Sequence, residues 1–372
     1  MHGKYRRVGR RSHYRANFMY NTANINQSAE RAIEMLQRII AIPSYSREET
    51  KLADFIEEIA SLDGFSPCRK GNNVWCVSSV FLPKRPTLLL NAHIDTVRPV
   101  KGWMHDPHMP SLEGDVLYGL GSNDCGGGLV ALYEVFRLCE ADNDLPWNLV
   151  YLASAEEEVS GQGGIESVLS DLPKIDVAIV GEPTNMQPAI AEKGLMVIDV
   201  VAHGKAGHAA RNEGVNAIYK ALEDIAWCKN YRFEKISPLL GEVKMSVTVI
   251  QAGTQHNVVP DECRFTIDVR SNECYTNQEI LDEIGRNLQS ELKARSTRLN
   301  SSHIASEHPL VQKCTEMGKM PFGSPTLSDQ ALMPFPSLKI GPGDSARSHT
   351  ADEYIKLSEI RDGIADYLQL IG

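Results

Sequence analysis

The chain has 372 residues, of which 42% are hydrophobic and 23% are charged, and its formal net charge is −10. A chain of this length normally divides into two domains, and an acidic surface argues against nucleic-acid binding, which needs a clustered basic face. The sequence contains no apolar run near the roughly 18–20 residues that cross a bilayer. We therefore expect a cytoplasmic protein with neither a nucleic-acid nor a membrane partner.

The first 18 residues differ from the rest, because they are rich in arginine and contain no acidic side chain. A transit peptide has a similar composition but also an apolar helical face, which this segment lacks. We interpret residues 1–18 as a basic disordered tail. The eight cysteines include no CxxC pair, and their spread is typical of reduced thiols rather than of a disulfide framework or a four-cysteine zinc site.

Helices alternate with short apolar segments in the first half of the chain. The first helix is expected to begin near Ser28, a residue type that caps helices, and to end before Pro43. Apolar strands are expected at residues 87–90, 149–153 and 177–180, and a helix is expected at residues 129–138 between the first two. Near-continuous apolar strands between helices predict an α/β domain with a mostly parallel sheet and helices on both faces.

The pattern changes after Gly194. Residues 196–202, 243–250 and 263–269 alternate apolar and polar side chains, as half-buried antiparallel strands do. Helices are expected beside them at residues 216–228 and 277–294, and a last helix near residues 359–370. The sequence therefore predicts a larger domain formed by residues 19–194 and 301–372, with a smaller α+β domain inserted at residues 195–300.

Histidines and carboxylates follow the predicted strands of the larger domain. In an open α/β sheet, functional groups gather beyond the carboxyl ends of the strands. The residues at these places are His93 and Asp95, Asp124, the run Glu156, Glu157 and Glu158, Glu182 and, late in the chain, His349. Imidazoles and carboxylates are zinc ligands, so the combination predicts a metal site at one edge of the sheet.

In their order along the chain, these motifs resemble those of the zinc-dependent deacylases and exopeptidases, a family that includes acetylornithine deacetylase, succinyl-diaminopimelate desuccinylase, aminoacylase and glutamate carboxypeptidase. The resemblance begins near Ser28 and covers nearly all of the chain that follows. It implies a zinc-binding catalytic domain with two Zn²⁺ ions, for which Co²⁺ can substitute. The implied ligands are His93 and Glu182 for one ion, Glu158 and His349 for the other, and Asp124 as a bridge, with Asp95 orienting His93.

The acidic triplet allows two registers. In the family, Asp-Glu-Glu precedes a turn of small residues, and the turn Val159-Ser160-Gly161 places Glu156 at the Asp position. The resemblance then makes Glu157 the general base, which takes a proton from water and passes one to the leaving amine. The register one residue earlier remains the alternative.

Three residues of the predicted insertion resemble family positions that face the substrate. His208, in a Gly-His-Ala context, resembles the histidine that stabilises the oxyanion, often in the neighbouring subunit's site, and His203 is the competing candidate. Asn257 and Arg270 resemble the residues that bind the substrate's carbonyl and carboxylate groups. The resemblance therefore implies a homodimer with a lid and dimerisation domain. The alternatives are that His208 is a surface histidine, that Asn257 caps a turn and that Arg270 forms a surface ion pair.

The sequence departs from the family after the bridging position. The family often carries a lysine two residues after this aspartate, whereas the run here is Asp124-Cys125-Gly126-Gly127-Gly128. This departure puts finer substrate contacts in doubt but leaves metal binding intact. The family also implies a cis peptide between Asp124 and Cys125. We expect Cys125 to be inert, because no histidine is evident beside it.

The late run Gly341-Pro342-Gly343-Asp344, followed by His349 and its neighbours, most resembles acetylornithine deacetylase. It implies a metal-dependent hydrolase that cleaves the amide of an N-acyl amino acid in arginine biosynthesis. An N-acyl-citrulline hydrolase or a succinyl-specific variant, a succinyl-diaminopimelate desuccinylase, and a dipeptidase or carboxypeptidase are the alternatives. A non-enzymatic binding protein is disfavoured, since no expected ligand or base is missing.

Overall fold

The computed structural model describes residues 22–372 apart from residue 212, and the predicted basic tail at residues 1–18 lies outside the described residues. The chain divides into two compact units. The large unit runs to Ile190 and resumes with Ile304–Pro321 and Ser328–Gly372, and the small unit comprises Ala191–His303 and Phe322–Leu327. No helix of the described part is long and apolar enough to cross a membrane.

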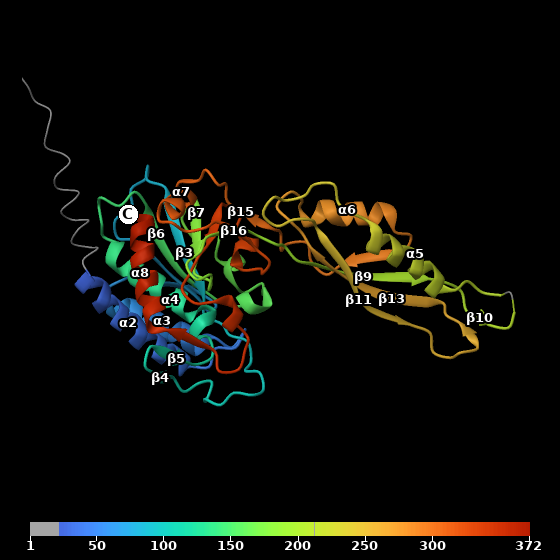
Figure 1. Ribbon diagram of the computed structural model, residues 1–372, viewed down its shortest axis with the longest axis horizontal. Helices are drawn as coiled ribbons and strands as arrows, with labels where there is room; N and C mark the ends of the chain where they lie inside the picture. Colours follow the sequence, from blue (N-terminus) through green and yellow to red (C-terminus); the bar gives the residue numbers. More distant parts are fainter. Residues whose placement is uncertain (1–21, 212) are drawn as a thin grey trace, which may run out of the picture. The chain divides into compact units, whose positions relative to one another are not determined.

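A mixed sheet, parallel at its centre, is the framework of the large unit (Figure 1). In the large unit the sheet order is β1 (Cys68–Lys70), β2 (Asn73–Val77), β6 (Asn148–Ser154), β3 (Thr87–His93), β7 (Val177–Val180), β17 (Ser337–Lys339) and β8 (Ala189–Glu192). The short strands β15 (Ser302–His303) and β16 (Phe322–Ser324) belong to segments of the small unit. The central strands β6, β3, β7 and β17 are parallel. Every residue of β3, β6 and β7 is buried, which explains their continuous apolar sequences.

Both faces of this sheet are covered. Helices α2 (Thr22–Ile40), α4 (Gly127–Cys139) and α8 (Leu357–Ile371) pack against one another, and α4 packs on β3 and β6. On the other face, apolar side chains of β3 and β6 meet the segment around Ile165 and Val168. Helices α3 (Thr50–Leu62) and α7 (Pro309–Glu316) pack on β2 and α8 respectively, while β4 (Ser111–Glu113), β5 (Val116–Tyr118) and β18 (Tyr354–Lys356) form a separate three-stranded sheet. The predicted α/β class is confirmed.

The expected start of the first helix is wrong. Helix α2 begins at Thr22, and Ser28 is buried inside it. There the Ser28 hydroxyl accepts a hydrogen bond from Arg137 of α4 at 3.1 Å. A serine followed by apolar periodicity resembles an N-cap locally, but Ser28 is buried beside Arg137, and the helix continues towards the N-terminus as far as Thr22.

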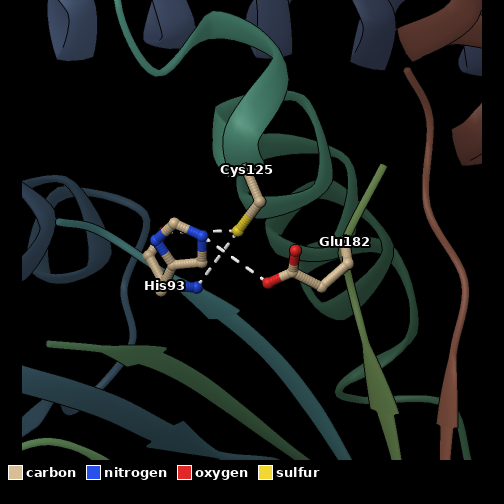
Figure 2. A group of neighbouring side chains, drawn as sticks. All are labelled: His93, Cys125 and Glu182. Atoms are coloured by element: carbon tan, nitrogen blue, oxygen red, sulfur yellow. Dashed lines mark hydrogen bonds and ion pairs between the residues drawn. The ribbon is translucent and has the colours of Figure 1, made fainter. Parts of the chain in front are cut away.

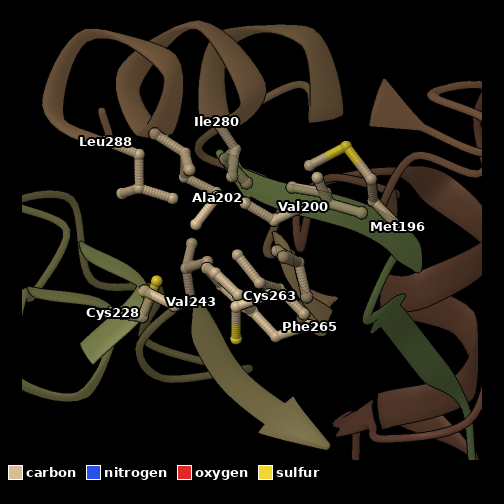
Figure 3. Packing of buried hydrophobic residues seen from close by; sticks show 14 of the residues in the cluster. Met196, Val200, Ala202, Cys228, Val243, Cys263, Phe265, Ile280 and Leu288 are labelled. Atoms are coloured by element: carbon tan, nitrogen blue, oxygen red, sulfur yellow. The ribbon is translucent and has the colours of Figure 1, made fainter. Parts of the chain in front are cut away.

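The small unit is a four-stranded antiparallel sheet with two helices. The order is β11 (Lys244–Ala252), β13 (Glu262–Arg270), β9 (Met196–His203) and β14 (Glu291–Ala294). The helices α5 (Ala217–Asn230) and α6 (Asn277–Asn287) supply Cys228, Ile280 and Ile284 to a core shared with Val200 and Phe265 of the sheet (Figure 3). A short ladder, β10 (Gly207–His208) with β12 (Val258–Val259), completes the unit.

The predicted helix at residues 277–294 is only partly correct. Helix α6 ends at Asn287, and residues 291–294 form β14, which pairs with β9. The turn between them is held by Asp224, whose carboxylate accepts the N–H groups of Gln289 and Ser290 at 3.0 and 3.1 Å. Helical propensity favours a continuous helix here, but pairing with a strand distant in sequence overrides it.

Candidate metal centre

Adjacent strands bring the predicted ligands to one edge of the large unit's sheet. His93 is the last residue of β3 and lies opposite Ser154, the last residue of β6, in the parallel register. The two strands therefore end level, and the acidic triplet begins two residues after β6. Glu182 comes two residues after β7, which lies on the other side of β3. The parallel register is thus the reason that these side chains meet.

Asp124 lies between two pairs of candidate ligands. Its Oδ1 is 3.3 Å from Nε2 of His93, and its Oδ2 is 3.5 Å from Nε2 of His349. Nε2 of His93 also lies 3.5 Å from Oε1 of Glu182. Nε2 of His349 lies 2.9 Å from Oε2 of Glu158. Each oxygen of Asp124 therefore faces a different histidine, and each histidine has its own glutamate.

The donor set fits divalent cations. Oε1 of Glu182 is buried and has no hydrogen-bond partner among the described residues. Burial raises the pKa of Glu182 to about 8, with the nearby Asp124 acting in the same direction. The hydrogen bond to Glu158 raises the pKa of His349 to about 9. Carboxylates crowded in this way are stabilised in their ionised form by a cation, and imidazole with carboxylate is a donor set that suits zinc.

Asp95 connects His93 to the acidic triplet. Nδ1 of the His93 ring lies 2.9 Å from the carbonyl oxygen of Asp95, so an Nδ1–H donates there and Nε2 faces the carboxylates. The Asp95 carboxylate accepts the N–H groups of Glu157 at 2.9 Å and Glu158 at 3.1 Å. It also accepts the hydroxyl of Ser46 at 2.7 Å.

The three glutamates of the triplet point in different directions. Glu156 has a left-handed backbone with φ of 55°, and its carboxylate accepts the N–H of Gly163 at 3.4 Å and lies 3.7 Å from Arg47. Oε2 of Glu157 instead lies 4.0 Å from Nε2 of His93, and Glu158 contacts His349. Of the triplet, Glu157 and Glu158 therefore reach the histidines while Glu156 faces the following turn.

Cys125 lies directly beside His93, contrary to the expectation that no histidine is near it (Figure 2). Its Sγ accepts the backbone N–H of His93 at 3.2 Å. Sequence separation conceals this contact, since β3 and the loop meet only in the folded chain. Burial raises the pKa of the Cys125 thiol far above its usual range, which keeps it protonated and leaves it unsuited to act as a nucleophile.

The loop around the bridging position has the expected backbone. The peptide between Asp124 and Cys125 is cis, as predicted. Gly126 donates its N–H to the carbonyl oxygen of Gly121 at 2.9 Å, and a Cβ at position 126 would lie only 2.4 Å from that oxygen. This close approach leaves no room for a Cβ at position 126, so the loop of this chain requires glycine there.

Two buried carboxylates of the site escaped the sequence analysis. Asp329 accepts the hydroxyl of Ser154 at 2.6 Å, and burial raises its pKa to about 6. Glu353 accepts backbone N–H groups of the loop that carries Asp124. An acidic residue just before the short strand β18 is the only signal that the sequence offers for Glu353, and neither residue follows a long apolar strand.

The predicted substrate-facing residues all belong to the small unit. His208 lies in β10, exposed, with Nδ1 accepting the N–H of Ala210 at 3.1 Å. Asn257 is close to it, since its carbonyl oxygen accepts the N–H of Ala209 at 3.0 Å. Arg270 ends β13 and forms a two-pronged ion pair with Asp268. The competing His203 pairs with Glu291 at the edge of the sheet.

Comparison with known proteins establishes the family. The sequence profile of Peptidase family M20/M25/M40 matches residues 89–372, and the chain therefore belongs to this family of metallohydrolases. The resemblance inferred from the motifs is confirmed. The YXEP protein of Bacillus subtilis, a dinuclear metal-binding peptidase of the M20 family, has the same fold, with a TM-score of 0.69 and 16% identity over 93% of this chain and 98% of that chain.

Curated relatives have more than one activity. A Mycobacterium tuberculosis (strain CDC 1551 / Oshkosh) protein, provisionally named succinyl-diaminopimelate desuccinylase, is 29% identical over 341 residues, covering 88% of this chain and 94% of its own. Acetylornithine deacetylase of Proteus mirabilis is 27% identical over 360 residues, covering 88% of this chain and 92% of its own. The late sequence run most resembles acetylornithine deacetylase. The overall identities, by contrast, do not favour acetylornithine deacetylase over the desuccinylase.

Proposed function

We propose that the protein is a dinuclear zinc amidohydrolase that removes an acyl group from the α-nitrogen of an amino acid. The observation that carries this proposal is the position of Asp124, whose two oxygens face two histidines that each have a glutamate beside them. A carboxylate in this position would suit two zinc ions, which lie about 3.5–4 Å apart in two-metal sites. The dinuclear YXEP protein and the two amide-cleaving relatives support the proposal.

In this proposal, His93 and Glu182 would hold one ion, Glu158 and His349 would hold the other, and Asp124 would hold both. When bound, the ions lower the pKa of a shared water and polarise the scissile carbonyl. Glu157 lies beside His93 without a ligand position of its own, and it takes the proton from the water and passes it to the leaving amine nitrogen. Asp95 holds the backbone of Glu157 and thereby aims its carboxylate.

The small unit supplies the remaining groups of the proposed reaction. His208 donates a hydrogen bond to the oxyanion of the tetrahedral intermediate, across a two-fold homodimer. Asn257 and Arg270 bind the carbonyl and carboxylate of the substrate. In the structure the guanidinium of Arg270 forms an ion pair with Asp268. The described cysteines are all free, as suits a reaction in the cytoplasm.

N-Acetylornithine is the first candidate substrate, because the late run of glycines and His349 resembles acetylornithine deacetylase. N-Succinyl-diaminopimelate is the second, given the relative from Mycobacterium tuberculosis. Both compounds carry an amide on an α-amino nitrogen and a free carboxylate, so the same metal centre and one arginine serve either. The acyl group and the far end of the amino acid distinguish them.

A deacylation screen tests the proposal. The full chain, loaded with zinc or cobalt, is assayed against N-acetyl and N-succinyl derivatives of ornithine, citrulline, lysine and diaminopimelate, and against dipeptides. We expect release of a free amine from at least one N-acyl amino acid, and far slower release by Glu157→Gln with the same metal content. Cleavage of dipeptides alone would make the protein a dipeptidase and overturn the assignment as a deacylase.

A further inference from the structure

Glu353 is a buried carboxylate that binds backbone N–H groups. Its residue exposure is 2%, a rare environment for a glutamate unless its oxygens are paired. Oε1 accepts the N–H groups of Asn123 and Asp124, both at 2.9 Å, and Oε2 accepts the N–H of Gly121 at 3.0 Å. Three donors from one loop therefore converge on one side chain.

The two segments joined by Glu353 each carry a proposed metal ligand. Gly121 and Asn123 belong to the loop that ends in Asp124, whereas Glu353 follows His349 in the segment that leads into β18. The side chain of Asn123 strengthens the connection, since its amide donates to the carbonyl of Asp344 at 3.0 Å. The loop of the bridging residue is thus fastened to the segment of the second histidine.

This fastening governs where Asp124 points. The hydrogen bond from the Asp124 N–H fixes the backbone next to the carboxylate whose oxygens lie 3.3 and 3.5 Å from the two histidines. Without an acceptor at position 353, three buried N–H groups lose their partner, and the loop gains freedom to turn them towards water. A bridging carboxylate tolerates little displacement, because it must meet two ions at once.

We propose that Glu353 is a positioning residue of the metal centre, which gathers the N–H groups of the Gly121–Asp124 loop and holds Asp124 between His93 and His349. The inference rests on the proposed dinuclear site and adds a residue to it. Both carboxylate oxygens of Glu353 accept backbone N–H groups of this loop. It acts only through the backbone of the bridging residue.

The test compares two matched variants of the full chain. Glu353→Gln removes the charge and one acceptor oxygen, and Glu134→Gln makes the same change at another buried glutamate. Glu134 is 1% exposed and pairs with Arg31 and Arg137 rather than with the loop. Metal-free samples of each are titrated with Zn²⁺ and with Co²⁺ under conditions in which thermal unfolding shows that they are folded.

We expect Glu353→Gln to bind both metals about 10–100-fold more weakly, the usual effect of losing a residue that orients a ligand. Saturating zinc should restore much of its kcat, whereas Glu134→Gln should keep the wild-type metal affinity even if its Tm falls. Should Glu353→Gln fail to fold, Glu353→Asp, which keeps the charge but withdraws it by one methylene, is measured by the same criterion.

Two results would overturn the inference. One is wild-type metal affinity in the folded Glu353 variant. The other is an equal loss of affinity in Glu134→Gln, which would trace the effect to general destabilisation. A wild-type chain that binds two metals but hydrolyses no N-acyl amino acid would instead contradict the proposed function, and the metal titrations would still decide the role of Glu353.

Discussion

Asp95 and Glu157 are joined by a hydrogen bond of 2.9 Å in which the side chain of one binds the backbone of the other. The second carboxylate oxygen of Asp95 binds the N–H of Glu158 in the same way at 3.1 Å. Because the carbonyl oxygen of Asp95 also orients His93, one residue sets a histidine and two glutamates in a fixed relation. Groups that orient ligands in this way affect metal sites nearly as much as the ligands do.

Replacing Asp95 by asparagine should therefore lower kcat. The amide offers one acceptor oxygen instead of two, so one of the N–H groups of Glu157 and Glu158 loses its partner. We expect a loss of about 10–100-fold in kcat, with a smaller change in KM. Steady-state kinetics measure both. Ser46→Ala, which removes only a donor to Asp95, serves as the control, and equal kcat values in Asp95→Asn and the wild type would contradict the prediction.

The register of the acidic triplet predicts a different effect for each of three substitutions. Glu157→Gln should keep both metals and lose a factor on the order of 10²–10⁴ in kcat, the usual contribution of a positioned acid–base group. Glu158→Gln should lose one metal, because a neutral amide is a poorer ligand than a carboxylate. Glu156→Gln, whose side chain faces Gly163, should be the mildest. Metal content per subunit and kcat decide, and inactivity of Glu156→Gln with both metals bound would shift the register by one residue.

Complementation between subunits tests the proposed role of His208. If this exposed histidine acts in the partner's site, mixtures of inactive His208→Ala and inactive Glu157→Ala chains should regain part of the activity through hybrid dimers. The measurement is specific activity after subunit exchange, with exchange itself followed by labelled chains. His203→Ala is the matched control and should be active alone. Complete exchange without any recovery would place His208 outside the partner's site.

Removing the metals should lower thermal stability. Ions that bind only the folded chain stabilise it by mass action, by about 2.7 kcal/mol at a hundred times Kd. We expect chelation to lower Tm and zinc to restore it in the wild type and in Glu157→Gln, but far less in Asp124→Asn, which lacks the bridge. Scanning calorimetry at fixed zinc concentration measures this, and a Tm insensitive to chelation in the wild type would speak against a metal centre.

The sequence by itself determined the alternation of β3, α4, β6 and β7 and the kind of residue that follows each of these strands. Apolar runs such as those of β3 and β7 are local signals, and a polar ligand directly after them marks the edge of a parallel sheet. The same local signals misplace the start of α2, because Ser28 is buried inside the helix beside Arg137 instead of capping it. They also misplace the end of α6, because pairing of residues 291–294 with β9 outweighs helical propensity there.

Only the tertiary structure decided which groups surround the ligands. Three such contacts join residues far apart in the sequence. They are the contact of Cys125 with His93, the hydrogen bond of Ser154 to Asp329 and the hydrogen bond of the Asp124 N–H to Glu353. Sequence periodicity does not predict such partners. Whether a carboxylate is buried, and which N–H groups donate to it, depends on which segments the fold brings together. The sequence after each strand identifies the kind of ligand, whereas long-range hydrogen bonds set the orientation of those ligands.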